Sequence, residues 1–388
     1  MSPRRSVLQP ATMKNPRIAL VHDWLTGMRG GERTLEAICE LFPTATRFSL
    51  LHVHGSVSTT IEATGIRTSF IQKIPLSQRY YRSLLPLFPA AAEQFNLDDF
   101  DLIISTSHCV AKSIIAPGRA RHLCYCFTPM RYAWDQFPEY FGFDRIGPIR
   151  NRLLRQGLSM MARWDASTAY RPDRYVAISH YVAGRIKRYY NREARVIYPP
   201  VNTDFFHPGP EPIESYCLVV SALVPYKRID LAIRACALAG TPLRIVGDGP
   251  DLARLQAISG SDVTFFGSLS DRRVRSMYQR ATAVLLPGTE DFGIAPVEAQ
   301  ACGRPVIALD AGGACETVNH KDTGILVAEP TASAFADAIG RVKSTQFSPT
   351  TIREHAIRYS RERFKTAIQR EVVDLMTTPL CEHPNDAP

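Results

Sequence analysis

Short apolar runs alternate with longer segments of helical spacing along most of this chain. The runs are nearly continuous in Val, Ile and Leu, which is typical of strands buried on both faces of a parallel sheet. They lie at residues 17–23, 101–106, 121–127, 174–179, 217–223, 243–249, 263–268, 283–288 and 305–310. Between them, segments such as residues 229–240 carry apolar positions at helical spacing and end on a glycine. The pattern predicts an α/β fold built from doubly wound parallel sheets.

The pattern breaks around residues 199–215, which are rich in Pro and Gly and are typical of a linker. It restarts after this break, and 388 residues exceed what one hydrophobic core usually holds. We therefore expect two Rossmann-like domains facing across a cleft, at residues 1–205 and 206–354. A C-terminal helix at about residues 355–378 is expected to pack back on the first domain. Ligands of such sheets bind beyond the carboxyl ends of the strands.

Composition narrows the class of protein. The chain is 45% hydrophobic and 21% charged, which is typical of a globular protein. No apolar stretch approaches the roughly 18 residues that cross a bilayer, and no secretory signal is visible, so we expect a cytoplasmic protein. The nine cysteines show no paired framework and are expected to be reduced. A formal charge of +9 indicates an anionic partner, such as nucleotide phosphates, nucleic acid or a membrane surface, although ordinary solubility would also explain it.

The stretch "GTEDFGIAPVEAQACG" at residues 288–303 carries two glutamates separated by seven residues. Glu290 is expected in the loop after a strand, and Pro296 to open a helix that holds Glu298 in its first turn. Gly293 lets a ligand approach the backbone, and a helix N-terminus suits phosphate. Ionised carboxylates accept hydrogen bonds from hydroxyl groups, so the stretch fits a ligand with sugars at both ends and phosphate between. The alternative is that Glu298 complements the helix dipole and Glu290 is solvated.

Other strand ends carry candidate phosphate-binding groups. Lys227 and Arg228 follow the strand at 217–223 and could neutralise a pyrophosphate, or could be solvated. Gly30 and Gly31 precede a helix expected to begin near Glu32, and Gly247 lies in "VGDGP"; both could be plain Gly-rich turns. Neither stretch completes a dinucleotide fingerprint or a Walker motif.

Two further polar residues follow strands in the first half of the chain. Asp23 could orient an acceptor hydroxyl or cap a turn. His108 could contact a ligand or be a hydrogen-bonded structural histidine. The motifs present no paired carboxylates to a divalent ion and no His/Cys cluster, so neither a metal nor another cofactor is expected.

"EDFGIAPVE" at residues 290–298, followed by "AQACGRPVIALDAGGACETV", resembles the hallmark of the retaining glycosyltransferases of family 4, which have the GT-B fold. "YVAIS", "VIYPPVNTDFF", "VGDGP" and "FFGSLS" match in the same order, and the likeness covers roughly residues 17–330. "HDWLTGMRGGE" and "PMRYAWD" resemble the WbaZ-like mannosyltransferases of surface-polysaccharide assembly.

The resemblance implies a role for each matching position. Glu290 would contact the hydroxyls of the donor sugar, Glu298 the ribose of the nucleotide, and Lys227 the diphosphate, with Arg228 beside it. The remaining donor-binding positions would be the backbone at Phe292, Gly293 and Ile294, the base pocket at Phe266 and Gly267, and the glycines Gly30, Gly31 and Gly247.

Two departures from the family pattern bear on the site. Many relatives have Gly-Arg where this chain has Ser221-Ala222, and Arg228 or Arg131 could replace the missing arginine. Many also have a sugar-contacting histidine at the position aligned with Phe127, for which Thr128 or His108 could substitute.

The resemblance implies a retaining transfer of a hexose from a nucleotide diphosphate sugar to a glycan or lipid-linked glycan, with mannose from GDP-mannose favoured. A UDP-sugar donor, a non-catalytic nucleotide-sugar-binding protein, and an epimerase or phosphorylase of the same fold are the alternatives. A nucleic-acid-binding protein is disfavoured because no DNA-reading helix or RNA motif is present. Residues 67–95 and 145–164 mix cations with aromatic and aliphatic residues, so they could lie on an anionic membrane or be packed helices with solvated cations.

Overall fold

Seven parallel strands form the first of two sheets, in the order β3-β2-β1-β4-β5-β6-β7. The computed structural model describes residues 16–134 and 148–378, so residues 145–147 of the second basic segment and the end of the "PMRYAWD" motif lie outside the described residues. The strands of the first sheet are β1 (Ile18–His22), β2 (Thr46–Ser49), β3 (Ile66–Thr68), β4 (Leu102–Ser107), β5 (Arg121–Cys126), β6 (Arg174–Ala177) and β7 (Ala194–Val196).

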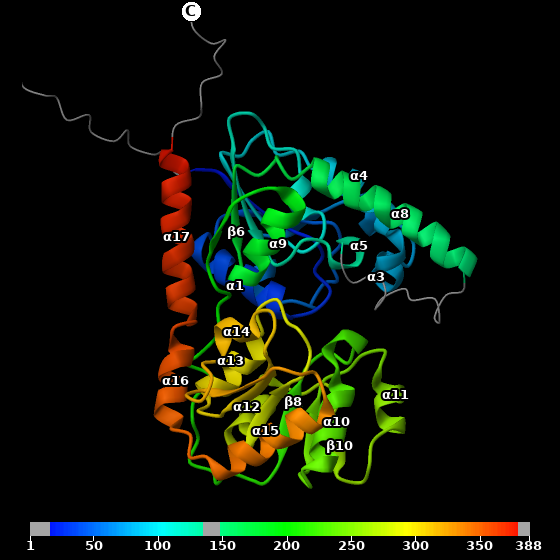
Figure 1. The fold of residues 1–388 in the computed structure, drawn as a ribbon. Helices are drawn as coiled ribbons and strands as arrows, with labels where there is room; N and C mark the ends of the chain where they lie inside the picture. The colour runs from blue at the N-terminus through cyan, green and yellow to red at the C-terminus, as the bar shows by residue number, and fades with distance from the viewer. Residues whose placement is uncertain (1–15, 135–147, 379–388) are drawn as a thin grey trace, which may run out of the picture.

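The second sheet has six parallel strands in the order β10-β9-β8-β11-β12-β13. They are β8 (Cys217–Val220), β9 (Leu243–Val246), β10 (Val263–Phe265), β11 (Ala283–Leu286), β12 (Val306–Leu309) and β13 (Gly324–Val327). Figure 1 shows the two sheets as separate units, each with helices packed on it. The predicted α/β architecture of two Rossmann-like domains is confirmed, and every predicted apolar run contains a strand.

Helices connect successive strands in both domains. Those of the first domain are α1 (Gly30–Leu41), α2 (Thr59–Glu62), η1 (Phe70–Lys73), α3 (Ser77–Tyr80), η2 (Tyr81–Leu87), α4 (Phe88–Glu93), η3 (Ala111–Ser113), α5 (Arg131–Trp134), α8 (Pro148–Ser167) and α9 (His180–Tyr190). Those that follow β8 are η4 (Pro225–Lys227), α10 (Ile229–Leu238), α11 (Leu252–Ala257), α12 (Asp271–Arg280), α13 (Ile294–Ala301), α14 (Ala314–Thr317), α15 (Ala332–Ser344), α16 (Pro349–Ile357) and α17 (Arg361–Thr377). None of the helices in the described ranges is both long and apolar enough to span a membrane.

The chain crosses between the domains twice. It passes from β7 to β8, and it returns between α16, which packs on α13, and α17, which packs on α1 and β5 of the first domain. Figure 1 shows α17 lying along the flank of the first domain. Its buried face carries Phe364 and Ile368, and Arg361 forms ion pairs with Glu36 and Glu40 of α1. The C-terminal helix therefore completes the first domain after the second has been traversed.

An aromatic cluster holds the two crossings against the site loop. The rings of Tyr198, Phe292 and Tyr359 lie with centroids 5.1–5.7 Å apart in each pair. Tyr198 belongs to the first crossing, Tyr359 to the second, and Phe292 to the loop between β11 and α13. The cluster thus packs both crossings of the chain against the loop between β11 and α13.

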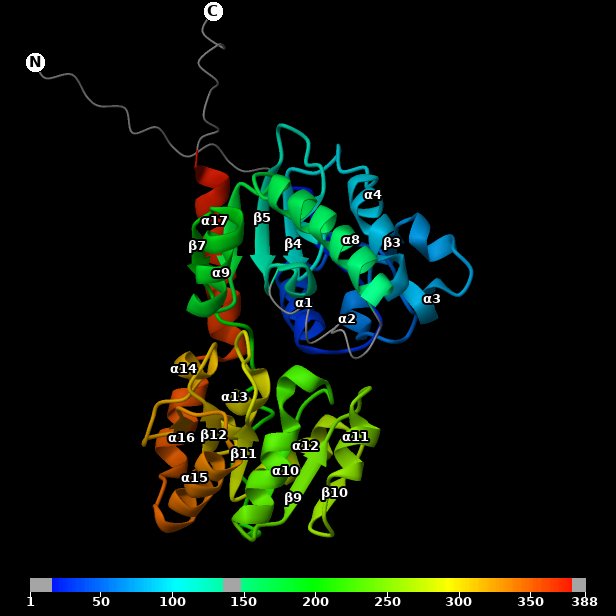
Figure 2. The ribbon, with the colours of Figure 1, turned by 45° about the vertical axis from the view of Figure 1, so that its right-hand side comes forward.

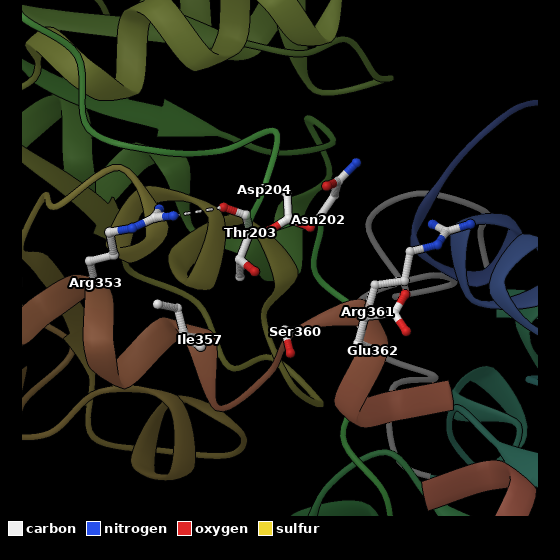
Figure 3. A pocket seen from close by; sticks show the side chains of 8 residues that line it. All are labelled: Asn202, Thr203, Asp204, Arg353, Ile357, Ser360, Arg361 and Glu362. Carbon is white, nitrogen blue, oxygen red and sulfur yellow. Dashed lines mark hydrogen bonds between the residues drawn. The ribbon is translucent and has the colours of Figure 1, made fainter. Parts of the chain in front are cut away.

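A pocket lies beside these crossings, between residues 202–204 of the linker and the junction of α16 and α17 (Figure 3). Arg353 from α16 donates to the backbone oxygens of Thr203, Phe206 and Ala301, at 3.2, 3.0 and 2.7 Å. This side chain thus ties the linker to the end of α13. None of the candidate site residues lines this pocket, which lies where the chain crosses between the domains.

Candidate active site

The carboxyl ends of the strands in both sheets face the region between the domains. Figure 2 shows β4 and β5 pointing toward it from the first domain and β9 pointing toward it from the second. Loops that leave these strand ends carry the candidate residues, as expected for ligand binding in doubly wound sheets.

The loop from β11 to α13 places Glu290 and the helix N-terminus at this edge. The helix begins at Ile294, with Gly293 as its N-cap at a φ of 91°, a left-handed conformation that favours glycine. The prediction that Pro296 opens the helix was therefore wrong by two residues, and Glu298 lies just past the first turn instead of in it. Within the described residues no side chain caps this helix, so its first N–H groups are available to an anion.

Lys227 and Glu290 meet at the centre of the candidate site. The Lys227 Nζ and a Glu290 carboxylate oxygen form an ion pair, and both side chains are largely buried. Gly288 permits this approach, since a Cβ there would lie 2.5 Å from the backbone oxygen of Tyr226. The structure thus brings together a cation and a carboxylate that the sequence separates by 63 positions.

Arg228, although adjacent to Lys227, is directed elsewhere. Its backbone is left-handed, with a φ of 53°, at the N-cap of α10. Its guanidinium pairs with Asp230 of the same helix, with an Nε–Oδ1 distance of 3.1 Å. The two neighbouring cations therefore do not act as a pair in this structure.

The Glu298 side chain is buried, separate from the Lys227–Glu290 pair. The Tyr278 hydroxyl of α12 donates to it at 3.2 Å. Burial raises the pKa of Glu298 to about 7, against the opposing effects of the Arg33 charge and the Tyr278 hydrogen bond. Arg33 belongs to α1 of the first domain and also pairs with Asp271 at 2.7 Å. The charged form of such a buried carboxyl would be stabilised by a ligand whose hydroxyl groups donate hydrogen bonds to it.

The glycine pair of the first domain lies at the start of α1. The helix begins at Gly30, two residues earlier than predicted, so both glycines belong to its first turn. A Cβ on Gly30 would lie 2.8 Å from Cδ1 of Ile294 in the opposite domain, and a Cβ on Gly31 would touch Phe127 and His22. The glycines therefore let α1 approach the N-terminus of α13 across the cleft.

The sequence left two roles open for Asp23, and in the structure this residue caps a turn. It is fully buried and accepts the backbone N–H groups of residues 108–111 at 2.7–3.0 Å. Its Oδ2 also lies 3.1 Å from Nδ1 of His108. A carboxylate with this many donors is not open to an acceptor hydroxyl, whereas the partly exposed His108 ring is held in a fixed orientation beside Phe127.

Thr128, Gly247, Phe266 and Gly267 occupy the margins of the site. The Thr128 hydroxyl is buried and bonds to the backbone oxygen of Pro129. Gly247 has no room for a side chain, because a Cβ would lie 1.9 Å from the oxygen of Ser221. Phe266 follows β10, and its side chain is exposed. The one cluster of three metal-ligating side chains among the described residues, His52, His54 and Glu62, includes no candidate site residue.

Asp291 is a buried residue of the candidate site that the sequence analysis did not single out. Its Oδ2 is 2.8 Å from Nε of Arg131, its Oδ1 is 3.1 Å from Nη1 of Arg185, and its backbone oxygen accepts the Ser179 hydroxyl. All three partners belong to the first domain. Nearby, Glu316 accepts the first N–H groups of α9 at 2.8 and 2.9 Å. The residue next to Glu290 thus anchors the site loop to the opposite domain.

A family of known proteins matches the part of the chain that holds most of these residues. Residues 202–363 match the family model described as glycosyl transferases group 1. This segment, less than half of the chain, carries Lys227, Glu290 and Glu298.

Among curated proteins, the chain is similar to two D-inositol 3-phosphate glycosyltransferases. That of Mycobacteroides abscessus is 32% identical over 190 residues, which are 42% of this chain and 43% of the relative. That of Rhodococcus erythropolis is 34% identical over 167 residues, which are 38% and 37% of the two chains. The chain thus spans less than half the length of these relatives.

Solved structures match over nearly the whole chain. The Anabaena protein HepE, in complex with UDP-glucose, has a TM-score of 0.67 at 20% identity and covers 92% of this chain and 99% of its own. Sucrose-phosphate synthase from Thermosynechococcus elongatus has a TM-score of 0.65 at 18% identity, with 93% and 98% covered. At these identities the likeness shows the fold, which is GT-B.

Proposed function

We propose that this chain is a retaining glycosyltransferase that moves a hexose from a nucleoside diphosphate sugar to a hydroxyl group of a glycan or lipid-linked glycan. The observation that carries the proposal is the Lys227–Glu290 ion pair beside the uncapped N-terminus of α13, with the buried Glu298 on the same helix. This arrangement supplies cations and N–H groups for phosphate between two carboxylates for hydroxyl groups. The matches to glycosyltransferases in the same segment support it.

In the proposed reaction the bond between the anomeric carbon and the leaving phosphate oxygen breaks, and the acceptor oxygen bonds to the same carbon. The acceptor proton leaves with the nucleoside diphosphate. Negative charge grows on that leaving group, where Lys227 and the N–H groups of α13 would stabilise it. Glu290 would exchange its ion pair for the sugar hydroxyls, and Glu298 would accept the ribose hydroxyls. This account assigns no step to a metal.

The favoured donor is GDP-mannose, because the "HDWLTGMRGGE" motif resembles the WbaZ-like mannosyltransferases. A UDP-sugar is the second candidate, because HepE, a structural neighbour, was solved with UDP-glucose. Incubating the purified chain separately with GDP-mannose and UDP-glucose, and following nucleoside diphosphate release, tests both. Saturable binding with no release, with or without added glycan acceptors, would instead indicate a non-catalytic binding protein.

We further propose that the enzyme works at the cytoplasmic face of a membrane, where a lipid-linked acceptor would lie. From Ala63 to Ala92 the chain has four cations and no acidic residue. In this segment Leu76, Tyr80 and Leu87 are exposed at 70%, 51% and 40%. An anionic bilayer suits both features. We expect the protein to co-sediment with phosphatidylglycerol vesicles but not with phosphatidylcholine vesicles, and the co-sedimentation should decrease as salt is added. Co-sedimentation with neither kind of vesicle, or with both kinds equally, would refute this proposal.

A further inference from the structure

Arg131 reaches the candidate site from the opposite domain. It is the first residue of α5, a few residues past β5 at the carboxyl edge of the first sheet. Its Nε lies 2.8 Å from Oδ2 of Asp291, which is the neighbour of Glu290. Its Cζ lies 5.5 Å from the ring centroid of Tyr226, the neighbour of Lys227. A first-domain guanidinium therefore stands next to the Lys227–Glu290 pair.

The charges around Asp291 leave this group electropositive. One carboxylate serves two guanidinium groups, because Arg185 occupies Oδ1 while Arg131 occupies Oδ2. Arg185 is the more deeply buried, at 7% exposed against 19% for Arg131, so Arg131 is the more accessible of the two. With Lys227 and Glu290 included, three cations face two carboxylates. The group can accept the negative charge of a phosphate without a further counter-ion.

We propose that Arg131 binds the diphosphate of the donor from the first domain, opposite Lys227 of the second. This inference rests on the proposed function and adds a specific phosphate-binding residue to it. Within the described residues, the bonds of Arg131 to Asp291 use Nε and Nη2. The two N–H groups of Nη1 are therefore left for phosphate oxygens, and the fork of a guanidinium can hold both anions at once.

The consequence is that a diphosphate would bridge the two domains. Lys227 lies on η4 of the second domain and Arg131 on α5 of the first. In this structure the Asp291 carboxylate pairs with the Arg131 guanidinium. The competing role for Arg131 is purely structural, as a partner for the Asp291 carboxylate.

Isothermal titration of matched variants separates these roles. Wild type, Arg131→Gln, Arg131→Lys and Asp291→Asn would each be titrated with UDP and GDP and with the corresponding nucleosides. Arg234→Gln, on the exposed face of α10, is the control for loss of one positive charge. Circular dichroism melts verify that each variant is folded, and Arg131→Lys, which keeps the charge, replaces Arg131→Gln if that variant does not fold.

We expect Arg131→Gln to weaken nucleoside diphosphate binding about tenfold or more, since a charge-assisted bond is lost, while nucleoside binding is unchanged. Asp291→Asn should stay within about threefold of wild type for the diphosphate, because the guanidinium is retained. Equal losses in Arg131→Gln and Asp291→Asn, or equal losses for nucleoside and diphosphate, would overturn the proposal. If wild type itself binds neither UDP nor GDP, the proposed function fails, whereas tight wild-type binding unaffected by Arg131→Gln overturns this inference alone.

Discussion

Replacing Glu298 with glutamine should change the pH dependence of stability. Glu298 is 8% exposed, and its main partner in the described residues is the Tyr278 hydroxyl. Burial raises its pKa from 4.5 to about 7, so the folded protein binds a proton at this carboxyl more readily than the unfolded chain does. Glu298 therefore costs no stability below about pH 4.5. The cost grows as pH rises toward 7 and is complete above it.

The size of the effect follows from the shift. A change from 4.5 to about 7 corresponds to roughly 3 kcal/mol, at about 1.4 kcal/mol for each pKa unit. Glutamine does not titrate in this range. The free energy of unfolding of Glu298→Gln, relative to wild type, should thus rise by up to about 3 kcal/mol between pH 5 and pH 8. Glu32, whose pKa burial also raises to about 7, is present in both proteins and cancels in the difference.

Urea unfolding at several pH values measures this difference. The three tryptophans, at positions 24, 134 and 164, all precede the second sheet, so circular dichroism and hydrogen exchange of peptides from β11 and α13 are the suitable probes. Glu329→Gln, on the exposed loop after β13, serves as the control for replacing a surface carboxylate. A flat difference for Glu298→Gln would refute the assignment of a buried carboxyl with a raised pKa. Nucleoside diphosphate sugar binding should weaken in the same variant, which would show that the costly carboxylate serves the ligand.

Three further experiments test the site and the helix that supports it. Lys227→Ala should lower kcat about a hundredfold or more with the fold intact, because Lys227 pairs with Glu290. Arg228→Ala should lower kcat much less, because Arg228 pairs with Asp230 instead. Near-normal steady-state turnover of Lys227→Ala would contradict the assignment of the site. Gly30→Ala should raise the donor KM several-fold, because the new methyl group would lie 2.8 Å from Cδ1 of Ile294. Adding Ile294→Val, which removes that Cδ1, should lower the KM again. A double variant with the same KM as Gly30→Ala would argue against contact between these two residues. Arg361→Ala should lower the free energy of unfolding by about 1 kcal/mol, because the ion pairs of Arg361 are partly exposed. Hydrogen exchange should become faster in α17 but not in α13. Equal acceleration in both helices would contradict separate docking of the two.

Strands could be predicted where their sequences are long apolar runs, as for β10 at the edge of the second sheet, whereas the inner strand β2, which reads "TRFS", and the edge strand β13 were missed. β11, a central strand buried on both faces, reads "AVLL", a continuous apolar run. β3 and β7 are the outer strands of the first sheet and read "IRT" and "ARV", each with an exposed arginine in the middle. An outer strand tolerates polar residues because part of it faces solvent. The hydrophobic pattern alone therefore did not reveal β3 or β7.

The candidate site was predictable as far as it is local. Glu290 and Glu298 share one strand–loop–helix unit, and Lys227 follows a neighbouring strand of the same sheet. The contacts between the domains were not predictable in this way. Arg131 and Arg185 reach Asp291 over 160 and 106 positions of the chain, and no spacing rule brings them together. The position of α13 relative to Pro296 also escaped prediction, because Gly293 in a left-handed conformation starts the helix earlier than the proline signal suggested.

The double crossing of the chain has a consequence for biosynthesis. As the polypeptide leaves the ribosome, the strands of the first sheet emerge first, but the groove on α1 and β5 stays unfilled until Phe364 and its neighbours on α17 have been made. The whole second sheet is synthesised in that interval. The half that holds Lys227 and Glu290 can thus reach its native state before the half that emerged earlier is closed. For this chain the order of synthesis and the order of completion of the domains are opposite.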